Sequence, residues 1–186
     1  MSFEDVFLPH LNAAYNLARW LTRNKHDAED VVQEAYLRAL KFFHTFEGTD
    51  GRGWLLTIVR NTCYTWLKRN RAPKFSYDLD QAGEVSDGDA PDLEEVLVRN
   101  SQVRLVTEAI ERLPVGFREV LILRELEELS YKEIAAIIGA PVGTVMSRLA
   151  RGRKKLQSEL SGNNSMNRPV LVSRQWSKNL RKKEIV

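Results

Sequence analysis

Residues 130–156, SYKEIAAIIGAPVGTVMSRLARGRKKL, are the most informative segment of the chain. Ser130 and Glu133 can form a capping box, in which each side chain accepts a hydrogen bond from a backbone N–H that the start of a helix leaves unpaired. Apolar residues then recur on one helical face until Gly139, which allows the backbone to leave the helix, and Pro141, which blocks its continuation. The sequence therefore predicts a helix, a tight turn from Gly139 to Pro141 and a second helix.

The second of these helices is basic. Its inner face is predicted to hold Val142, Val145 and Leu149, while most of its polar side chains lie on other faces. Two short helices joined by a tight turn, the second rich in arginine, are typical of a helix-turn-helix, whose second helix enters the major groove of DNA. The alternative is an ordinary solvated helix of a bundle, but the capped first helix and the turn favour DNA binding. The basic residues that we expect to contact DNA are Arg148, Arg151, Arg153, Lys154 and Lys155.

The composition limits the classes of protein to consider. With 186 residues, of which 43% are hydrophobic and 28% charged, the chain can form one domain or two small ones with real cores. The net charge is only +3, so any basic function must lie in local patches. Cys63 is the only cysteine, which excludes an internal disulfide and a multi-thiolate metal site and fits a reducing compartment. Because no signal segment and no apolar run of membrane-spanning length are found, we expect a cytoplasmic protein without a membrane segment.

Two amphipathic helices are predicted near the N-terminus. The first covers residues 3–21, with Ser2 as its cap, and Pro9 either separates its first turn, so that the helix proper begins at Pro9, or kinks it. The second begins behind a capping Asp27 and follows the three-four spacing of apolar residues. Its predicted inner face consists of Ala28, Val31, Val32, Ala35, Tyr36, Ala39, Leu40 and Phe43.

The outer face of the second helix is acidic and holds one apolar residue. Glu29, Asp30 and Glu34 lie there with Gln33, and Leu37 is expected to be an exposed apolar side chain among them. Simple solvation is the usual reason for such a face. The alternative is that this face, with Leu37 at its centre, docks a basic partner helix.

A third helix is predicted after a glycine-bearing loop at residues 46–53. Cys63 on its inner side is most simply a small core residue. Residues 60–74 carry five positive charges and no acid, interleaved with aromatic side chains. This combination suits single-stranded nucleic acid, whose phosphates attract cations and whose unstacked bases lie on planar groups; burial of Tyr64 or Trp66 in the core is the alternative. The candidate nucleic-acid residues are Arg60, Asn61, Tyr64, Trp66, Lys68, Arg69 and Arg71.

The sign of the charge reverses after the third helix. Residues 78–95 hold eight acids and no base, with glycine and proline among them, which is typical of a flexible linker. Helical periodicity then returns, breaks at Pro114 and continues, while the end of the chain carries six basic residues and one acid and is expected to be disordered. We therefore predict an all-α protein of two small helical domains joined by an acidic flexible linker, the second domain containing the helix-turn-helix. The predicted divisions are residues 1–75, 76–95, 96–160 and 161–186.

Three stretches together resemble a known family. They are DAEDVVQEAYLRAL (residues 27–40), WLLTIVRNTCYTWLKRNR (residues 54–71) and FREVLILRELEELSYKEIAAIIGAPVGTVMSRLARGRKKL (residues 117–156). In this order they look like the conserved regions 2 and 4 of the extracytoplasmic-function (group IV, sigma-70 family) RNA polymerase sigma factors. The resemblance covers about residues 3–160, with a short acidic linker and no third domain between the regions, so it is more specific than a helix-turn-helix alone.

The resemblance implies partners and roles for individual residues. The first domain would bind the coiled coil of the β′ subunit of core RNA polymerase and the minus-10 element of promoter DNA, and the second would read the minus-35 element. The residues that match the polymerase-docking surface are Asp30, Gln33, Glu34 and Leu37. Those that match the part that melts and reads the minus-10 element are Asn61, Lys68 and Arg69, and those on the minus-35 recognition helix are Thr144, Ser147, Arg148, Arg151 and Arg153. Met146 stands where many members of the family carry Arg, so the minus-35 sequence preference of those members cannot be assigned to this chain. An anti-sigma factor is a further partner that the family commonly has.

Two other classes of function fit the sequence less well. A transcriptional regulator that binds duplex DNA independently of polymerase would use the same helix-turn-helix, but it has no need of the acidic face around Glu34 or of the basic and aromatic third helix. An enzyme finds no support, because His10, His26 and His44 are scattered and no phosphate loop, catalytic triad or metal-ligand spacing is present. We therefore expect no catalytic residues, no cofactor and no metal.

Overall fold

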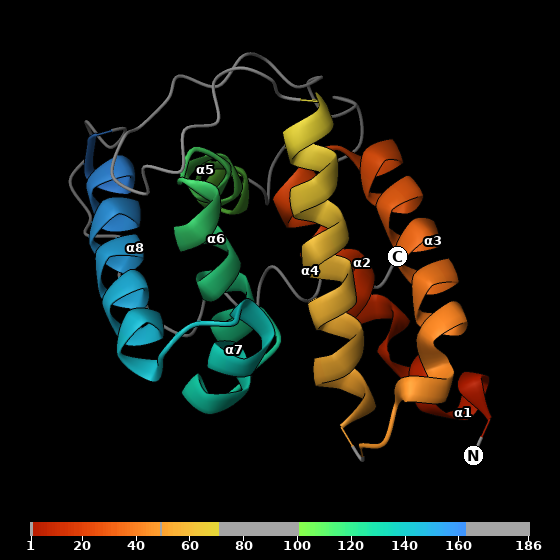
Figure 1. Cartoon of the computed structure of the whole chain (residues 1–186). Coiled ribbons are helices and arrows are strands. Elements are labelled where there is room, and N and C mark those ends of the chain that lie inside the picture. Colours follow the sequence, from red (N-terminus) through yellow and green to blue (C-terminus); the bar gives the residue numbers. More distant parts are fainter. Residues whose placement is uncertain (1, 49, 71–100, 163–186) are drawn as a thin grey trace.

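The computed structural model describes residues 2–48, 50–70 and 101–162, and every regular element in these ranges is a helix (Figure 1). The prediction of an all-α protein is thereby confirmed. The predicted acidic linker, Arg71 and residues 163–186 of the predicted basic tail lie outside the described residues, whereas residues 161 and 162 end the last helix. Among the described helices, none is by itself long and apolar enough to cross a membrane. Only the pair Tyr131–Ile138 and Val142–Ser161, bent by 101°, reaches the required length and composition when both helices are counted together.

The N-terminal module contains the first two predicted helices and the basic third helix. Its elements are α1 (Phe3–Phe7), η1 (Leu8–His10, a 3₁₀ turn), α2 (Leu11–Thr22), α3 (Lys25–Phe42), η2 (Phe43–Thr45, also 3₁₀) and α4 (Gly51–Asn70). The capping role of Ser2 is confirmed, because its hydroxyl accepts a hydrogen bond from the Asp5 N–H and the Asp5 carboxylate accepts one from the Ser2 N–H. Pro9 lies in η1, so the first turn is separate and the helix proper begins at Leu11.

The C-terminal module contains the helix-turn-helix. Its elements are α5 (Ser101–Glu111), α6 (Val115–Leu121), the π-helical segment η3 (Ile122–Leu126), α7 (Tyr131–Ile138) and α8 (Val142–Gly162). The capping box is confirmed: the Glu133 N–H donates to Ser130 Oγ at 3.2 Å, and the Ser130 N–H donates to Glu133 Oε2 at 2.6 Å. Gly139 ends α7 with φ +64°, in the left-handed region that favours glycine. Because α7 and α8 then meet at 101°, they have the geometry of a helix-turn-helix.

Three local predictions are wrong. Asn24 caps α3 in place of Asp27, since the Asn24 side chain accepts a hydrogen bond from the Asp27 N–H at 3.1 Å. Leu40 is 55% exposed, because the inner face of α3 is a narrow stripe of alanines and valines that packs on α2 and α4, and Leu40 lies beside that stripe. Val142 is exposed as the first residue of α8, ahead of the part of the helix that α6 and α7 cover.

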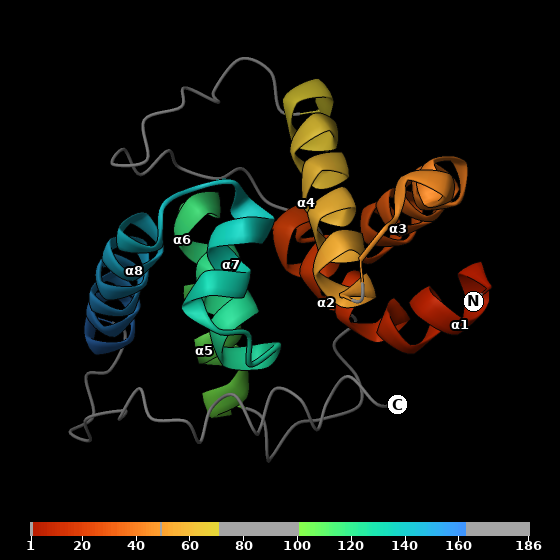
Figure 2. The same ribbon diagram turned by 60° about the horizontal axis from the view of Figure 1, so that its bottom comes forward.

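The two modules pack against each other, which the sequence did not predict. In both views α2 and α4 lie beside α6 and α7 (Figure 1 and Figure 2), and buried side chains of both modules form one hydrophobic cluster. Arg118 of α6, only 3% exposed, donates to the carbonyl of Trp20 at 3.0 Å. This carbonyl is one of those that the C-terminal end of α2 leaves without a helical partner, and a cation there also complements the helix dipole. The contact between the modules is therefore polar and specific as well as apolar.

Candidate functional site

The outer face of α3 is accessible to a partner. Asp30, Gln33 and Leu37 are exposed, and Leu37 keeps 63% of its surface open to solvent, which confirms the prediction that it is exposed. Glu34 is half-buried and pairs with Arg38 one turn later, with 2.5 Å between Oε1 and Nη2. The face thus offers carboxylates around one apolar side chain, an arrangement that suits a partner with cations around an apolar patch.

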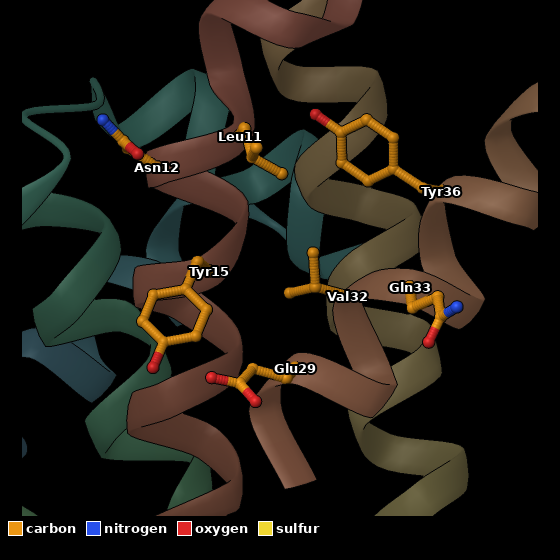
Figure 3. Close-up of a pocket in the computed structure, with 7 residues that line it drawn as sticks. All are labelled: Leu11, Asn12, Tyr15, Glu29, Val32, Gln33 and Tyr36. Carbon is orange, nitrogen blue, oxygen red and sulfur yellow. The ribbon is translucent and has the colours of Figure 1, made fainter. Parts of the chain in front are cut away.

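A shallow groove of about 430 Å³ lies between α2 and α3 beside this face (Figure 3). Its lining residues are Leu11, Asn12, Tyr15, Glu29, Val32, Gln33 and Tyr36. Gln33 belongs to both the groove and the acidic face, so the two surfaces are continuous. Tyr36 donates to the carbonyl of Phe7 at 2.9 Å, and burial raises the pKa of its hydroxyl. Because Leu11 and Leu40 are both exposed, the apolar surface on this side of the protein is larger than the single side chain that the sequence predicts.

The basic and aromatic segment of α4 is only partly free. The exposed residues of the predicted set are Asn61, Lys68 and Arg69, while Arg71 lies outside the described residues. Tyr64 and Trp66 are half-buried, so neither side chain is a fully exposed stacking surface and neither is fully buried in the core. The guanidinium of Arg60 lies 4.4 Å from the centre of the Tyr64 ring. Burial, together with the charge of the nearby Glu119 carboxylate, raises the pKa of Tyr64 far above its usual value.

The predicted DNA residues of α8 are also divided between open and engaged positions. The exposed ones are Ser147, Arg151 and Lys154, and the half-buried ones are Thr144, Arg148, Arg153 and Lys155. Arg153 donates to Glu125 of η3 at 2.6 Å, and this hydrogen bond raises the pKa of its guanidinium. Met146, where the sequence is expected to depart from the family pattern, is exposed. Arg148, in contrast, donates to Glu119 of α6.

Glu119 connects α4 with α8, and sequence reasoning missed it. Its carboxylate has no exposed surface and accepts from Arg60 Nε at 2.9 Å and from Arg148 Nη1 at 3.4 Å. Burial acts to lower the pKa of Arg60, but the charge and hydrogen bond of Glu119 outweigh it and raise that pKa above its usual value. The sequence did contain a signal for this role of Glu119, because the adjoining residues 120–123 are all apolar. A helix that is apolar all round is buried on every side, and a charged residue in such a helix needs a partner.

Metal ligands do not gather in the described part of the chain. In residues 2–48, 50–70 and 101–162, no three His, Cys, Asp or Glu side chains are close enough together to hold a metal ion. Cys63 is buried in α4, and this burial raises the pKa of its thiol far above the usual value. The described surfaces therefore offer charge and shape for binding, and Cys63 is confirmed as a core residue.

In comparison with known sequences, two family models match separate parts of the chain. Residues 6–72 match the family model for Sigma-70 region 2, and residues 104–156 match that for Sigma-70, region 4. The chain is 31% identical over 169 residues to the ECF RNA polymerase sigma factor SigW of Bacillus subtilis, covering 86% of this chain and 89% of that protein. It is 36% identical over 141 residues to the ECF RNA polymerase sigma-E factor of Escherichia coli, and this match covers 72% of this chain and 74% of that protein. The match to SigE of Mycolicibacterium smegmatis, at 30% identity over 167 residues, covers 88% of this chain and 63% of that protein.

Solved structures of other proteins share the fold. The sigma factor RpoE from Bartonella quintana, in complex with the anti-sigma factor NepR, has a TM-score of 0.66 and 31% identity and covers 87% of this chain and 98% of that one. CnrH, in complex with the cytosolic domain of CnrY, has a TM-score of 0.62 and 23% identity, and the match covers 87% of this chain and 89% of that one. At this identity the similarity to CnrH is evidence for a shared fold only. On the strength of these sequence matches, the chain belongs to the extracytoplasmic-function (ECF) RNA polymerase sigma factors of the sigma-70 family.

Proposed function

We propose that the chain directs transcription initiation by binding core RNA polymerase and bringing it to promoters with minus-10 and minus-35 elements. The observation that carries the proposal is Leu37, which is 63% exposed among carboxylates on α3 in the same chain as the helix-turn-helix. A regulator that acts alone on duplex DNA has no need of such a face. A polymerase subunit needs a docking site in addition to its DNA contacts, and an exposed apolar residue is a common sign of one.

The docking surface for the coiled coil of the β′ subunit consists of Asp30, Gln33, Glu34 and Leu37. Its carboxylates attract a basic partner and help to fix the register of the contact. Leu37 supplies the apolar centre, where buried side chains contribute most of the affinity of an interface. The groove between α2 and α3 extends the same surface and gives the partner further apolar area.

The promoter contacts lie on α4 and α8. On α4, Asn61, Lys68 and Arg69 hold the separated strand of the minus-10 element, and Tyr64 and Trp66 offer ring surface to its bases. The α8 residues that read the minus-35 element in the major groove are Thr144, Ser147, Arg148, Arg151 and Arg153, with Lys154 and Lys155 on the phosphates. Specificity thus comes from both ends of the promoter, and opening of the duplex is assigned to the N-terminal module.

The polymerase performs the chemistry, so the chain itself is not an enzyme. It acts in the cytoplasm, where it meets the polymerase. An anti-sigma factor is a proposed regulator, and the proposal is supported by RpoE of Bartonella quintana, which was solved in complex with the anti-sigma factor NepR.

The test combines the pure chain, core RNA polymerase and a template library in which the minus-10 and minus-35 elements are randomised. We expect transcripts only when the chain is present, and we expect the transcribed templates to share sequence at both elements. If no template depends on the chain, and the chain alone binds duplex DNA tightly and specifically, it is instead a regulator that works independently of polymerase.

A further inference from the structure

The acidic face of α3 and the groove beside it form one continuous surface, which we call the α3 surface. Residues 27–34 hold four acids and no base. The side chains of Glu29 and Glu34 are 52% and 42% exposed. Glu29 also lines the groove, whose apolar lining consists of Leu11, Tyr15, Val32 and Tyr36 (Figure 3). A ligand that fits the α3 surface therefore carries cations beside a large apolar side chain.

The end of the same chain has this chemistry. Residues 174–183 read RQWSKNLRKK and contain five bases and no acid, with Trp176 and Leu180 four residues apart. Residues four apart lie on one face of a helix, so a helical segment of this sequence would present both apolar side chains to the groove. The segment lies outside residues 6–72 and 104–156, which the family models match, so those matches assign it no role.

The connection between α8 and this segment is long enough to reach α3. In both views α8 and α3 lie on opposite sides of the protein (Figure 1 and Figure 2). Residues 163–175 lead from the end of α8 to Trp176 and can span up to about 45 Å when fully extended. A compact protein of about 160 residues has a radius of gyration of about 15 Å, so the connection can cross it.

Attachment to the same chain allows a weak contact to be formed most of the time. A short tether gives its end a local concentration of about 1 mM. At this concentration a contact with a dissociation constant of about 0.1 mM is formed in roughly 90% of the molecules. A partner that needs the same surface then binds about tenfold more weakly, because only the remaining molecules offer it.

We propose that residues 174–183 bind the α3 surface of their own chain, with Trp176 in the groove and the basic side chains beside the carboxylates. The consequence for polymerase rests on the proposed function, because the α3 surface contains the proposed docking residues around Leu37. Core polymerase displaces the segment, which then becomes available to promoter DNA. The segment thus weakens polymerase binding by the free chain and adds phosphate contacts once polymerase is bound.

The test locates the segment in the free full chain by nuclear magnetic resonance. A spin label is attached at Ser177→Cys, which keeps Trp176 and all the bases, while Cys63 is buried and stays unlabelled. The label broadens the amide signals of nearby residues in the nitrogen-15-labelled chain. We expect residues 29–37 of α3 to lose most of their signal intensity. A mixture of nitrogen-15 chains without the spin label and spin-labelled chains without nitrogen-15 reports contacts between copies, and we expect no broadening in it.

Two variants weaken the contact, and each has a matched control. Trp176→Ala removes the apolar side chain from the segment, whereas Leu171→Ala shortens an apolar side chain of the same tail outside it. Glu29→Lys reverses a charge on the α3 surface, whereas Glu159→Lys reverses one on α8. We expect Trp176→Ala and Glu29→Lys to restore the signals of residues 29–37 and the two controls to leave them broadened. Melting curves verify that each variant is folded.

The effect on polymerase is measured with the two tail variants, because neither changes the net charge or the α3 surface. Without DNA, Trp176→Ala should bind core polymerase about tenfold more tightly than Leu171→Ala, as the fraction of free α3 surface requires. Equal affinities of these variants would overturn the competition with polymerase.

Full signal intensity at residues 29–37 of the spin-labelled chain, or broadening that lies on other helices instead, would overturn the contact itself. Equal broadening in the mixed sample would assign it to a second copy and overturn the contact within one chain. Failure of the proposed function would appear elsewhere, as the absence of polymerase binding by every variant and of chain-dependent transcription. The measurement on the free chain does not depend on that result.

Discussion

Reversal of the charge on Glu34 tests the proposed docking surface most directly. In the structure Glu34 makes one ion pair, with Arg38 at i+4, and both side chains are more than a third exposed. Removal of such a pair costs about 0.3 to 0.5 kcal/mol, and the like-charge pair that lysine would form with Arg38 costs a similar amount. The free energy of unfolding should therefore fall by about 1 kcal/mol at most, and the fold should persist.

The effect of Glu34→Lys on polymerase binding should be larger. A lysine that faces a basic partner helix is expected to cost about 2 kcal/mol or more, which weakens the affinity about thirtyfold. Binding to core polymerase is measured without DNA, together with thermal unfolding. Glu159→Lys is the matched control, because Glu159 is also a partly exposed helical glutamate paired with one arginine, Arg112, but lies in the other module. Equal polymerase affinity of the two variants, with normal melting curves, would refute the assignment.

Three further predictions concern the DNA surfaces and the turn. Arg148→Ala and Arg151→Ala should each reduce the free energy of promoter binding by about 1 to 3 kcal/mol. An arginine that reads a base should also relax selection at one base pair, whereas one that holds a phosphate should weaken binding to all promoters alike. Selection from a randomised minus-35 library in which both variants match wild type in base preference and in strength would contradict this. Gly139→Ala should lower the free energy of unfolding in urea by about 1 to 2 kcal/mol, because φ is +64° at this residue. Gly143→Ala is the control, since the space around an added Cβ is equally open but φ is not positive; it should be neutral or stabilise the protein by up to about 1 kcal/mol. Equal effects of the two substitutions would contradict the role of the left-handed backbone at Gly139. Removal of residues 163–186 should flatten the plot of log affinity against log salt for promoter DNA by about 0.9 for each phosphate that the tail neutralises, and an unchanged slope for the holoenzyme would show that the basic tail does not touch phosphate.

Features with a local cause could be predicted from the sequence. The capping box of Ser130 and Glu133 and the left-handed turn at Gly139 depend on residues within one helical turn, so spacing and residue type were sufficient. The cap of α3 shows the limit of this reasoning. Asn24 and Asp27 are both good capping residues, and the choice between them depends on where the chain leaves α2, which it does at Arg23 with φ 65°.

Exposure could be predicted only where one face of a helix has no neighbour. Leu37 is exposed as expected because the outer face of α3 meets no other described element. Leu40 follows the apolar spacing equally well but lies at the edge of the buried stripe, where the size and placing of α2 and α4 decide whether it is covered. The same holds for the candidate DNA residues, because periodicity placed them on helices without showing which of their guanidinium groups were engaged.

The helices, the helix-turn-helix, the acidic face around Leu37 and the family could all be predicted without a structure, because each depends on the type and spacing of residues within short stretches. The packing of the two modules, and the binding of Glu119 to Arg60, which lies 59 residues earlier in the chain, became visible only in the folded protein. The partner of a buried charge depends on two surfaces that exist only after each module has folded. For that reason the sequence alone could indicate candidate DNA-contacting residues, but not that two of them, Arg60 and Arg148, share one buried carboxylate.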